Sequence, residues 1–228
     1  GLDILELNCG TGEDAVLFSE KGFNIVATDV SEEMLKVTQE KVQQYSMQNK
    51  ISSQYLDLDS FDDSLFEKKL DLIFSNFGGL NCINPESLKK LLEKIPAILA
   101  PEGRFVAVIM PKFCLWESLY FGLKLQFRKA FRRWTKKSVD ANLQGVLVKT
   151  WYFWPSQVRA WAKKFAVVNV RPIGIALPPS FLQKYFLRHK RSLSRLNSLE
   201  KKLGRWSSFS RMSDHYLIDL KLKPQQGY

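Results

Sequence analysis

The most informative stretch of this chain for its fold is the turn Glu6-Leu7-Asn8-Cys9-Gly10-Thr11-Gly12. It follows a short apolar run at residues 4–7 that predicts a buried strand, and it precedes a helix-period segment at residues 13–21 that Gly22 closes. A glycine-rich turn between a strand and a helix lets the backbone approach a ligand closely. It also points the amides of the helix N-terminus at that ligand.

The segments after this turn alternate β-rich runs with helix-period stretches, the pattern of a parallel sheet covered by helices. Helix starts are expected at Ser31 and at Asn84-Pro85, because Asn and Ser are good caps and Pro suits the first helical position. Further strands are expected at residues 24–28, 53–56, 70–74, 103–110, 167–175 and 215–222. An extended stretch is expected at residues 146–153, and basic helices at about 180–188 and 192–204. We therefore predict an α/β, doubly wound, mostly parallel sheet.

The glycines of the turn do not by themselves identify the ligand. Gly10, Gly12 and Ala15 satisfy the G-x-G-x-x-A spacing of dinucleotide-binding proteins, so a nicotinamide-dependent dehydrogenase stays open. Asp29, at the end of the second expected strand, fits both classes, because a carboxylate there hydrogen-bonds ribose hydroxyls in either.

Four motifs in order resemble those of class I S-adenosylmethionine-dependent methyltransferases. Residues 6–12 are similar to the E/D-x-G-x-G-x-G signature, and Thr-Asp-Val-Ser-Glu-Glu-Met-Leu at residues 28–35 is similar to the second motif. Asp57 and Leu58 stand at the family's adenine-binding segment, and residues 70–76 resemble its fourth-strand motif. The resemblance covers residues 1–111 and continues to the final strand. It implies a Rossmann-like seven-stranded sheet with a final antiparallel strand, and an enzyme that uses S-adenosyl-L-methionine.

The resemblance also implies a role for each motif residue. The backbone of residues 6–12 would hold the aminoacyl part of the cofactor and Asp29 its ribose, and Asn76 would lie beside the reactive methyl. Val30 and Met34 would cover one adenine face, and Asp57 with Leu58 the adenine edge and other face. The expected cofactor-binding residues are therefore Glu6, Asn8, Cys9, Gly10, Thr11, Gly12, Asp29, Val30, Met34, Asp57, Leu58 and Asn76.

Asn8 departs from the family pattern, because it replaces the first glycine of the signature. Asn tolerates left-handed backbone geometry better than most residues, but its side chain stands where the cofactor lies close. That side chain either weakens binding or supplies a polar contact. A non-catalytic, cofactor-binding relative stays an alternative.

The charge of the chain divides sharply after residue 111. Residues 1–111 carry 10 Lys and Arg against 18 Asp and Glu, whereas residues 112–228 carry 24 against 5. We expect residues 1–111 to form the cofactor-binding half. Residues 112–228 would complete the same sheet and carry basic cap insertions at about 112–150 and 180–212. Residues 116–137 predict one basic amphipathic helix, with Lys124, Arg128 and Arg132 along the edge of its apolar face.

Three roles fit this basic helix: it packs on the sheet, roofs a hydrophobic substrate pocket, or lies on an anionic membrane. Our leading hypothesis is in-line methyl transfer to a small or lipid-like hydrophobic acceptor, at oxygen, nitrogen or carbon. The runner-up is an RNA methyltransferase, which the Asn-Phe-Gly-Gly at residues 76–79 disfavours because it lacks the N-P-P-Y pattern of enzymes that methylate nucleic-acid amines. The expected substrate-side residues are Phe77, Trp116, Tyr120 and Tyr152.

A catalytic base is not identified by the sequence. A sulfonium methyl is already a strong electrophile, so holding the nucleophile in line is the main task of such an enzyme. The side chains available to assist an oxygen or nitrogen nucleophile are His215, Tyr120, Tyr152 and Glu117. We leave the catalytic residues and the oligomeric state unassigned.

The amino-acid composition narrows the classes of protein to which this chain could belong. The longest apolar runs, such as residues 105–110, are far shorter than the roughly 20 residues that a membrane-crossing helix needs. The three cysteines lack paired spacing and only two histidines are present, so we expect neither a disulfide framework nor a metal site. No charged-then-apolar leader precedes the first strand, which favours the cytoplasm. The chain starts without Met almost inside an apolar run, so we expect a further segment ahead of residue 1.

Overall fold

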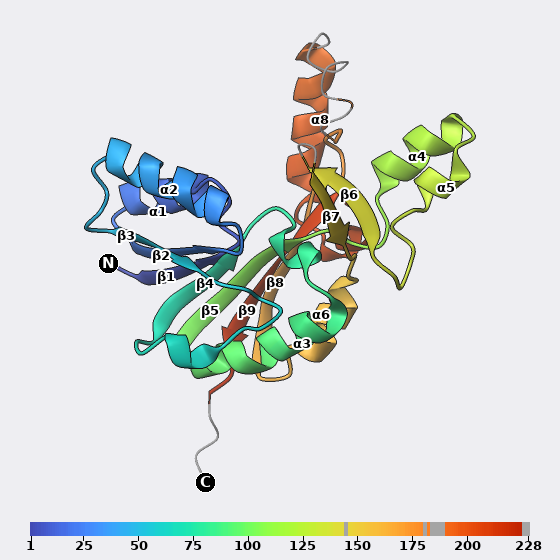
Figure 1. Ribbon diagram of the computed structural model, residues 1–228. Helices are drawn as coiled ribbons and strands as arrows, with labels where there is room; N and C mark the ends of the chain where they lie inside the picture. Colours follow the sequence, from blue (N-terminus) through green and yellow to red (C-terminus); the bar gives the residue numbers. More distant parts are fainter. Residues whose placement is uncertain (144–145, 180–181, 183–189, 225–228) are drawn as a thin grey trace.

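The computed structural model describes residues 1–143, 146–179, 182 and 190–224 (Figure 1). The strands are β1 (Asp3–Leu7), β2 (Asn24–Asp29), β3 (Ile51–Tyr55), β4 (Leu70–Ser75), β5 (Leu99–Ile109), β6 (Val139–Leu143), β7 (Val146–Thr150), β8 (Phe165–Ile173) and β9 (His215–Leu222). The α-helices are α1 (Glu13–Glu20), α2 (Glu32–Gln44), α3 (Pro85–Lys94), α4 (Leu115–Leu123), α5 (Phe127–Ala130), α6 (Pro155–Trp161) and α8 (Lys190–Leu203). Short 3-10 helices are η1 (Asp63–Leu65), η2 (Gly79–Cys82), η3 (Ile95–Ala97) and η4 (Ser207–Arg211).

Seven strands form one sheet in the order β3-β2-β1-β4-β5-β9-β8. β1 to β5 pair in parallel, whereas β9 lies between β5 and β8 and is antiparallel to both. The predicted seven-stranded, mostly parallel sheet with a final antiparallel strand is therefore confirmed. Chain order reverses between β1 and β4, and the carboxyl ends of strands at such a switch point are where ligands bind in open α/β sheets.

The two faces of the sheet bury separate apolar clusters. Ile4 of β1 packs in a cluster with residues of α1 and α2, whereas Leu5 and Leu7 belong to the larger cluster with α3 and α6. Successive strand residues point to opposite faces, so one strand serves both clusters. Figure 1 shows α1 and α2 over one face and α3 and α6 over the other.

Both predicted helix starts are confirmed. The side chain of Ser31 accepts a hydrogen bond from the Met34 amide at 3.2 Å, and Asn84 Oδ1 accepts from the Glu86 and Ser87 amides at 3.0 Å each. These bonds satisfy amides that have no partner inside the helix. The start of α2 matters for the site, because it follows β2 directly at the switch-point edge.

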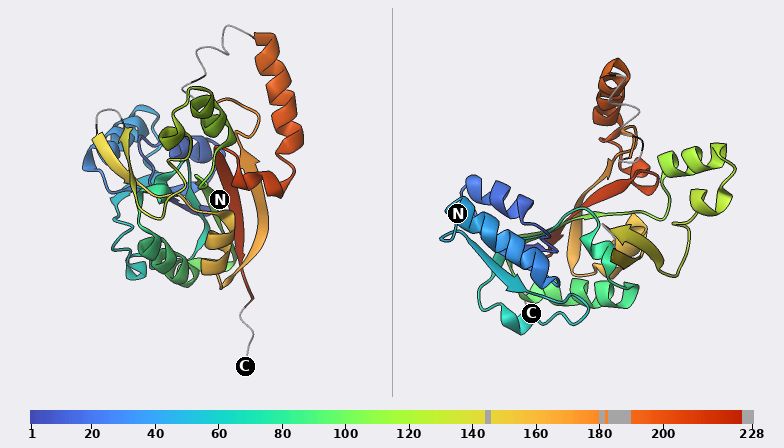
Figure 2. Two further views of the ribbon diagram at one scale, coloured as in Figure 1. Left: turned by 90° about the vertical axis from the view of Figure 1, so that its right-hand side faces the viewer. Right: turned by 45° about the horizontal axis from the view of Figure 1, so that its top comes forward.

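The predicted single helix over residues 116–137 is wrong. The chain forms α4, turns at Leu125, whose φ is +55°, and then forms only the short α5. The expected apolar face does not pack on the sheet, because Leu123 is 86% and Trp134 65% exposed. Figures 1 and 2 show α4 and α5 standing out from the body of the molecule, as α8 does in another direction.

Other expectations differ from the structure by small amounts. The third strand spans β3 rather than residues 53–56, and the stretch expected to be extended at 146–153 is regular only as β7, which pairs with the unpredicted β6. A helix expected at about 180–188 falls outside the described residues except for Leu182, whereas the one expected at 192–204 is α8. Within the described ranges no helix is long and apolar enough to cross a membrane.

The β6–β7 hairpin is tied to the sheet by Asn81, which is completely buried in η2. Its side-chain amide donates to the carbonyls of Met110 and Trp151, and its Oδ1 accepts from the Met110 amide at 2.8 Å. The Trp151 amide in turn donates to the Asn81 carbonyl at 2.7 Å. These bonds hold the end of β7 beside the carboxyl end of β5, at the edge where the motif turns lie.

Candidate functional site

The turn after β1 adopts left-handed geometry at three alternate residues: Asn8 (φ +57°), Gly10 (φ +54°) and Gly12 (φ +74°). At Gly12 a Cβ would lie 2.7 Å from Thr38 Cγ2, so only glycine fits there. At Gly10, by contrast, no heavy atom lies within 4 Å of the Cβ position. The backbone of Gly10 therefore faces open space into which a ligand can approach.

Asp29, at the end of β2, organises this turn. Its Oδ2 accepts a hydrogen bond from the Gly10 amide and its Oδ1 accepts one from the Ser31 amide, both at 2.9 Å. Thr38 of α2 also donates from its hydroxyl to the Gly10 carbonyl at 3.0 Å. The second motif thus positions the first, and each Asp29 oxygen keeps a lone pair for a ligand hydroxyl.

Asn8 fits because Gly79 leaves room for its side chain. A Cβ on Gly79 would lie 2.6 Å from Asn8 Cβ and 2.9 Å from its Oδ1. The Asn8 Oδ1 atom is buried and has no hydrogen-bond partner within the described part of the chain. The Asn8 side chain, which replaces a glycine of the family pattern, therefore fills the space over η2. Its Oδ1 atom stays without a partner at the site among the described residues.

Carboxylates gather beside this turn. Glu6 is 2% exposed, and its Oε2 has no hydrogen-bond partner among the described residues. Burial, together with the charges of Asp14 and Asp29, raises the pKa of Glu6 to about 8. Asp14, on the first turn of α1, accepts a hydrogen bond from the Asn76 side-chain amide at 2.7 Å. This acidic end favours a positively charged ligand, because a cation lowers the cost of ionising Glu6.

A cavity of about 570 Å³ extends from this acidic end toward the basic half of the chain. It brings together the turns after β1 and β4, the end of β5, the β6–β7 hairpin and the start of β9. Its volume lies within the usual range for ligand pockets. The residues that line it are Glu6, Asn8, Cys9, Asp14, Asn76, Phe77, Gly78, Gly79, Cys82, Met110, Arg132, Arg133, Ala141, Thr150, Tyr152 and His215.

At the far end of the cavity, a buried ion-pair network joins α4 to the start of β9. Glu117, which is 1% exposed, accepts hydrogen bonds from Arg132 Nε and from Arg133 Nε, the latter at 2.7 Å. Arg133 also donates to the Asp214 carbonyl at 2.9 Å and to Asp214 Oδ1 at 2.7 Å. Asp214 Oδ2 lies 3.2 Å from Nδ1 of His215.

The network fixes the ionisation of Asp214. Burial acts to raise the pKa of this carboxyl group, but the hydrogen bond from His215 and the charge of Arg133 outweigh burial and hold the pKa well below its usual range. Asp214 is therefore a carboxylate throughout the physiological pH range.

Several predicted residues do meet in the cavity: Glu6, Asn8, Cys9, Asn76, Phe77 and Tyr152. Phe77 is held with φ +35°, an unusual geometry for a bulky residue, and its amide donates to Asn76 Oδ1 at 2.9 Å. Backbone strain of this kind is concentrated at functional sites. The fourth-strand turn therefore presents its aromatic ring at the mouth of the cavity.

The expected adenosine-side residues lie along the same edge but outside this cavity. Val30 is exposed and Met34 half-buried on the first turn of α2, so both are accessible. The Asp57 carboxylate accepts hydrogen bonds from the Asp59 amide and the Ser60 hydroxyl. Leu58 is buried in the larger core cluster, so its backbone rather than its side chain is available to a ligand. Their roles stay predictions.

Two expected substrate-side residues were misplaced by the helix prediction. Trp116 and Tyr120 lie on α4 and are not among the described residues that line the cavity. Tyr120 instead accepts a hydrogen bond from Lys124 Nζ, within the α4–α5 region that stands out from the body of the molecule. The residues that the sequence did not indicate include Asp14, Gly79 and Arg133. Asp14 and Gly79 stand beside motifs, whereas Arg133 does not.

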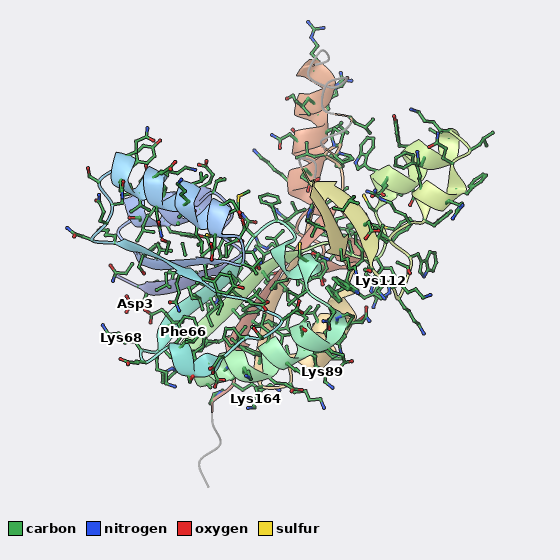
Figure 3. The ribbon with its side chains drawn as sticks, in the orientation of Figure 1. Asp3, Phe66, Lys68, Lys89, Lys112 and Lys164 are labelled. Carbon is green, nitrogen blue, oxygen red and sulfur yellow. The ribbon has the colours of Figure 1, made fainter. Side chains whose placement is uncertain are left out.

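A second cavity, of about 530 Å³, lies at the amino ends of β1, β2 and β4 and is lined in part by Asp3, Phe66 and Lys68. Figure 3 shows these three residues well away from the β6–β7 hairpin, on whose side of the molecule Lys112 lies. Ligands of open α/β sheets bind at the carboxyl ends of the strands. The cavity next to the motif turns is therefore the candidate site.

Comparison with known proteins gives the same class as the motif order. Residues 4–103 match the family model described as methyltransferase domain. YqeM of Bacillus subtilis is 33% identical over 104 residues, which are 44% of this chain and 39% of that protein. The demethylmenaquinone methyltransferase of Clavibacter sepedonicus is 32% identical over 106 residues, 46% of this chain and 40% of that protein. The matches thus span about two fifths of each relative's length.

Similarity in structure extends over nearly the whole chain. The crystal structure of an S-adenosylmethionine-dependent methyltransferase from Methanosarcina mazei superposes with a TM-score of 0.66 at 13% identity, over 97% of this chain and 92% of that one. At this identity the agreement establishes the fold. It shows that residues 112–228, which the family model does not reach, complete the same type of sheet.

We predict that Gly79→Ala destabilises the protein by about 1–3 kcal/mol, because the new methyl group meets the Asn8 side chain. Asn8→Gly removes that clash and relieves left-handed strain, so the double variant should recover most of the loss. Urea unfolding of the four proteins measures the coupling between the two positions. Equal destabilisation of Gly79→Ala with and without Asn8 would contradict the packing described.

We predict that Glu6→Gln alters how stability depends on pH. The folded-state pKa of about 8 lies above the ordinary glutamate value of 4.5, so the folded protein holds this proton through the intervening range. The free energy of unfolding of the wild type should therefore fall as pH rises from 5.5 to 8.5, by about 3 kcal/mol more than that of Glu6→Gln. Thermal unfolding at pH 5.5 and 8.5 measures the difference, and parallel profiles would refute the assignment.

Proposed function

We propose that this protein, whose residues 4–103 match a methyltransferase domain, is an S-adenosylmethionine-dependent methyltransferase that acts on a small or lipid-like acceptor. The observation that carries the proposal is the cavity that joins the motif turns to the cap. One end of it is acidic and borders an open glycine backbone. The other end is lined by residues from the second half of the chain, among them Arg132, Ala141, Tyr152 and His215.

The acidic end suits the charge of the proposed cofactor. S-adenosylmethionine carries positive charge on its sulfonium and ammonium groups, and a cation placed beside the buried Glu6 and neighbouring Asp14 favours the ionised form of Glu6. The unpartnered Glu6 Oε2 and Asn8 Oδ1 are available as acceptors for an ammonium group. The open space at Gly10 admits the aminoacyl part. The residues present thus fit this group.

The remaining motif residues would hold the other parts of the cofactor. Asp29 keeps lone pairs for ribose hydroxyls, and the exposed Val30 with Met34 offers an apolar surface for adenine. Asp57 and the Leu58 backbone stand after β3 for the adenine edge. The bound cofactor supplies an electrophilic methyl group, so the chain's own task is to orient the nucleophile and exclude water.

The acceptor side of the cavity supports a partly hydrophobic acceptor. Phe77, Met110, Ala141 and Tyr152 give it apolar walls, while Arg132 and His215 add polar groups at one side. A few polar groups in an apolar pocket fix the orientation of a ligand whose binding energy comes mainly from burial.

The α4–α5 region supports contact with an anionic membrane. Its exposed apolar side chains are Leu119, Leu123, Leu125, Phe127, Phe131 and Trp134, and its exposed basic side chains are Lys124, Arg128, Lys129, Arg132, Lys136 and Lys137. We call this set the cap surface. Apolar and cationic groups side by side match the interface of an anionic bilayer, where a lipid-like acceptor would be met.

We predict that S-adenosylhomocysteine stabilises the protein and that NADH does not. Ligand at 100 times its dissociation constant adds about 2.7 kcal/mol to the free energy of unfolding, which a thermal-shift assay resolves. Asp29→Asn should reduce the shift, whereas Asp219→Asn, on β9 and paired with Arg104, should not. A shift with NADH alone would instead assign the glycine turn to a dehydrogenase, and no shift with either ligand would refute the proposal.

We also predict that the protein co-sediments with vesicles containing phosphatidylglycerol but not with pure phosphatidylcholine vesicles. Replacing Leu123 and Trp134 by Ser should weaken binding about tenfold, because their side chains supply apolar contact. Leu65→Ser, at an exposed leucine outside the cap surface, serves as the control. If the variant with Ser at positions 123 and 134 binds the vesicles as well as Leu65→Ser does, the proposed membrane contact is refuted.

The excess of basic residues in 112–228 keeps RNA as the alternative acceptor. A single-stranded RNA competitor added to the same sedimentation assay distinguishes an RNA acceptor from a lipid-like acceptor. Displacement from vesicles by RNA, with RNA affinity that falls steeply as salt is added, would favour an RNA methyltransferase.

A further inference from the structure

The four side chains that the sequence left open as catalytic bases have different surroundings in the structure. Glu117 is buried and both its oxygens accept hydrogen bonds from arginines, so it is a structural anion. Tyr120 is not among the described residues that line the cavity. Tyr152 lines the cavity, but burial raises the pKa of its phenol, which disfavours the basic phenolate form. The fourth, His215, has the geometry of a base.

His215 is the first residue of β9, and its side chain lines the cavity beside the fourth-strand turn. Its ring packs edge-to-face against Phe77, with the centroids 5.7 Å apart, and its side chain is 17% exposed. Asp214 Oδ2 lies 3.2 Å from Nδ1, so we assign the ring proton of the neutral imidazole to Nδ1. Nε2 then carries the lone pair, and it has no hydrogen-bond partner in the described part of the chain.

Besides Asp214, three charged residues support the orientation of His215: Arg133, Glu117 and Arg132. Asp214 is held by two hydrogen bonds from Arg133, one to its carbonyl and one to its carboxylate. Arg133 is itself held by the buried Glu117, which Arg132 also contacts. These residues are positioning residues, because they act on the imidazole through Asp214. With neutral His215 the two arginines and two carboxylates balance in charge.

We propose that Nε2 of His215 is the general base of the methyl transfer, and that the acceptor therefore presents a hydroxyl or an amine N–H. The inference rests on the proposed function and narrows its acceptor class. A carboxylate acceptor is already ionised at neutral pH and needs no base. A base held 3.2 Å from a fixed carboxylate serves a nucleophile that must lose a proton.

The O–H or N–H bond of the acceptor breaks, and its proton goes to Nε2 of His215. The oxygen or nitrogen lone pair forms the bond to the methyl carbon, and the electron pair of the broken carbon–sulfur bond stays on sulfur. The positive charge thus passes from the sulfonium to the imidazolium, which the Asp214 carboxylate stabilises.

The tautomer of His215 is measured by nitrogen NMR on protein labelled in its histidines. The chain has only His189 and His215, so His215→Gln identifies both signals. With S-adenosylhomocysteine bound, we expect the proton of neutral His215 on Nδ1. Asp214→Asn should abolish this preference, whereas Asp219→Asn, on the same strand but paired with Arg104, should leave it unchanged.

Access to Nε2 is measured with phenol and toluene, which have similar shapes but differ in the hydroxyl group. Phenol should shift the Nε2 signal of the S-adenosylhomocysteine-bound protein, and toluene should not. For hydroxyl or amine acceptors, His215→Gln should lower kcat/KM about 100-fold. It should leave the thermal shift with S-adenosylhomocysteine intact.

The two proposals fail in different ways. A protein that does not bind S-adenosylhomocysteine refutes the methyltransferase proposal itself. A protein that binds it but has the His215 proton on Nε2, keeps its tautomer in Asp214→Asn, or shows no phenol-specific change at Nε2 refutes only the role of His215.

Discussion

The parallel pairing of β1 with β4, which sets Leu7 opposite Ser75, is the constraint on which the site depends. Because the strands run in the same direction, the turns that follow them leave the sheet at one edge. Asn8 of the first turn then meets Gly79 beyond the second, and Asp14 meets Asn76. Neither turn forms a site alone. Their adjacency produces a crevice that is acidic at its base and open above Gly10.

The direction of β9 supplies the other half of the site. β9 is antiparallel to β5, with Tyr216 opposite Ile109, so its first residue lies at the edge where the parallel strands end. This places His215 beside Phe77, although the two are far apart in sequence. A parallel β9 would have sent His215 to the opposite edge. The antiparallel strand is therefore what brings a titratable group from the end of the chain to the cavity.

The charged groups of the site are arranged so that each has a compensating partner except at the places where a ligand is expected. Arg132, Arg133, Glu117 and Asp214 satisfy one another, as a buried ion-pair network must to offset its desolvation cost. At the other end, Glu6 lacks such a partner, and burial keeps it largely protonated. The cavity thus runs from an uncompensated acid to a compensated network. That asymmetry distinguishes a cation-binding end from an acceptor end.

The sheet, the motif turns and the caps of α2 and α3 could be predicted from the amino-acid sequence. They depend on local signals: apolar runs, residues that tolerate positive φ, and side chains that cap the next few amides. The amino-acid sequence also located Glu6, Asn76 and Phe77, which stand beside recognisable strand ends. Which residues share the cavity became clear only from the way the strands are arranged in space. The apolar period at residues 116–137 carried no sign of the left-handed turn at Leu125, so Trp116 and Tyr120 were expected at the site and lie outside it. The fit of Asn8 over Gly79 and the pairing of Arg133 with Asp214 join residues about 70 and 80 positions apart, and contacts at that range follow from strand order and direction, which no local pattern records.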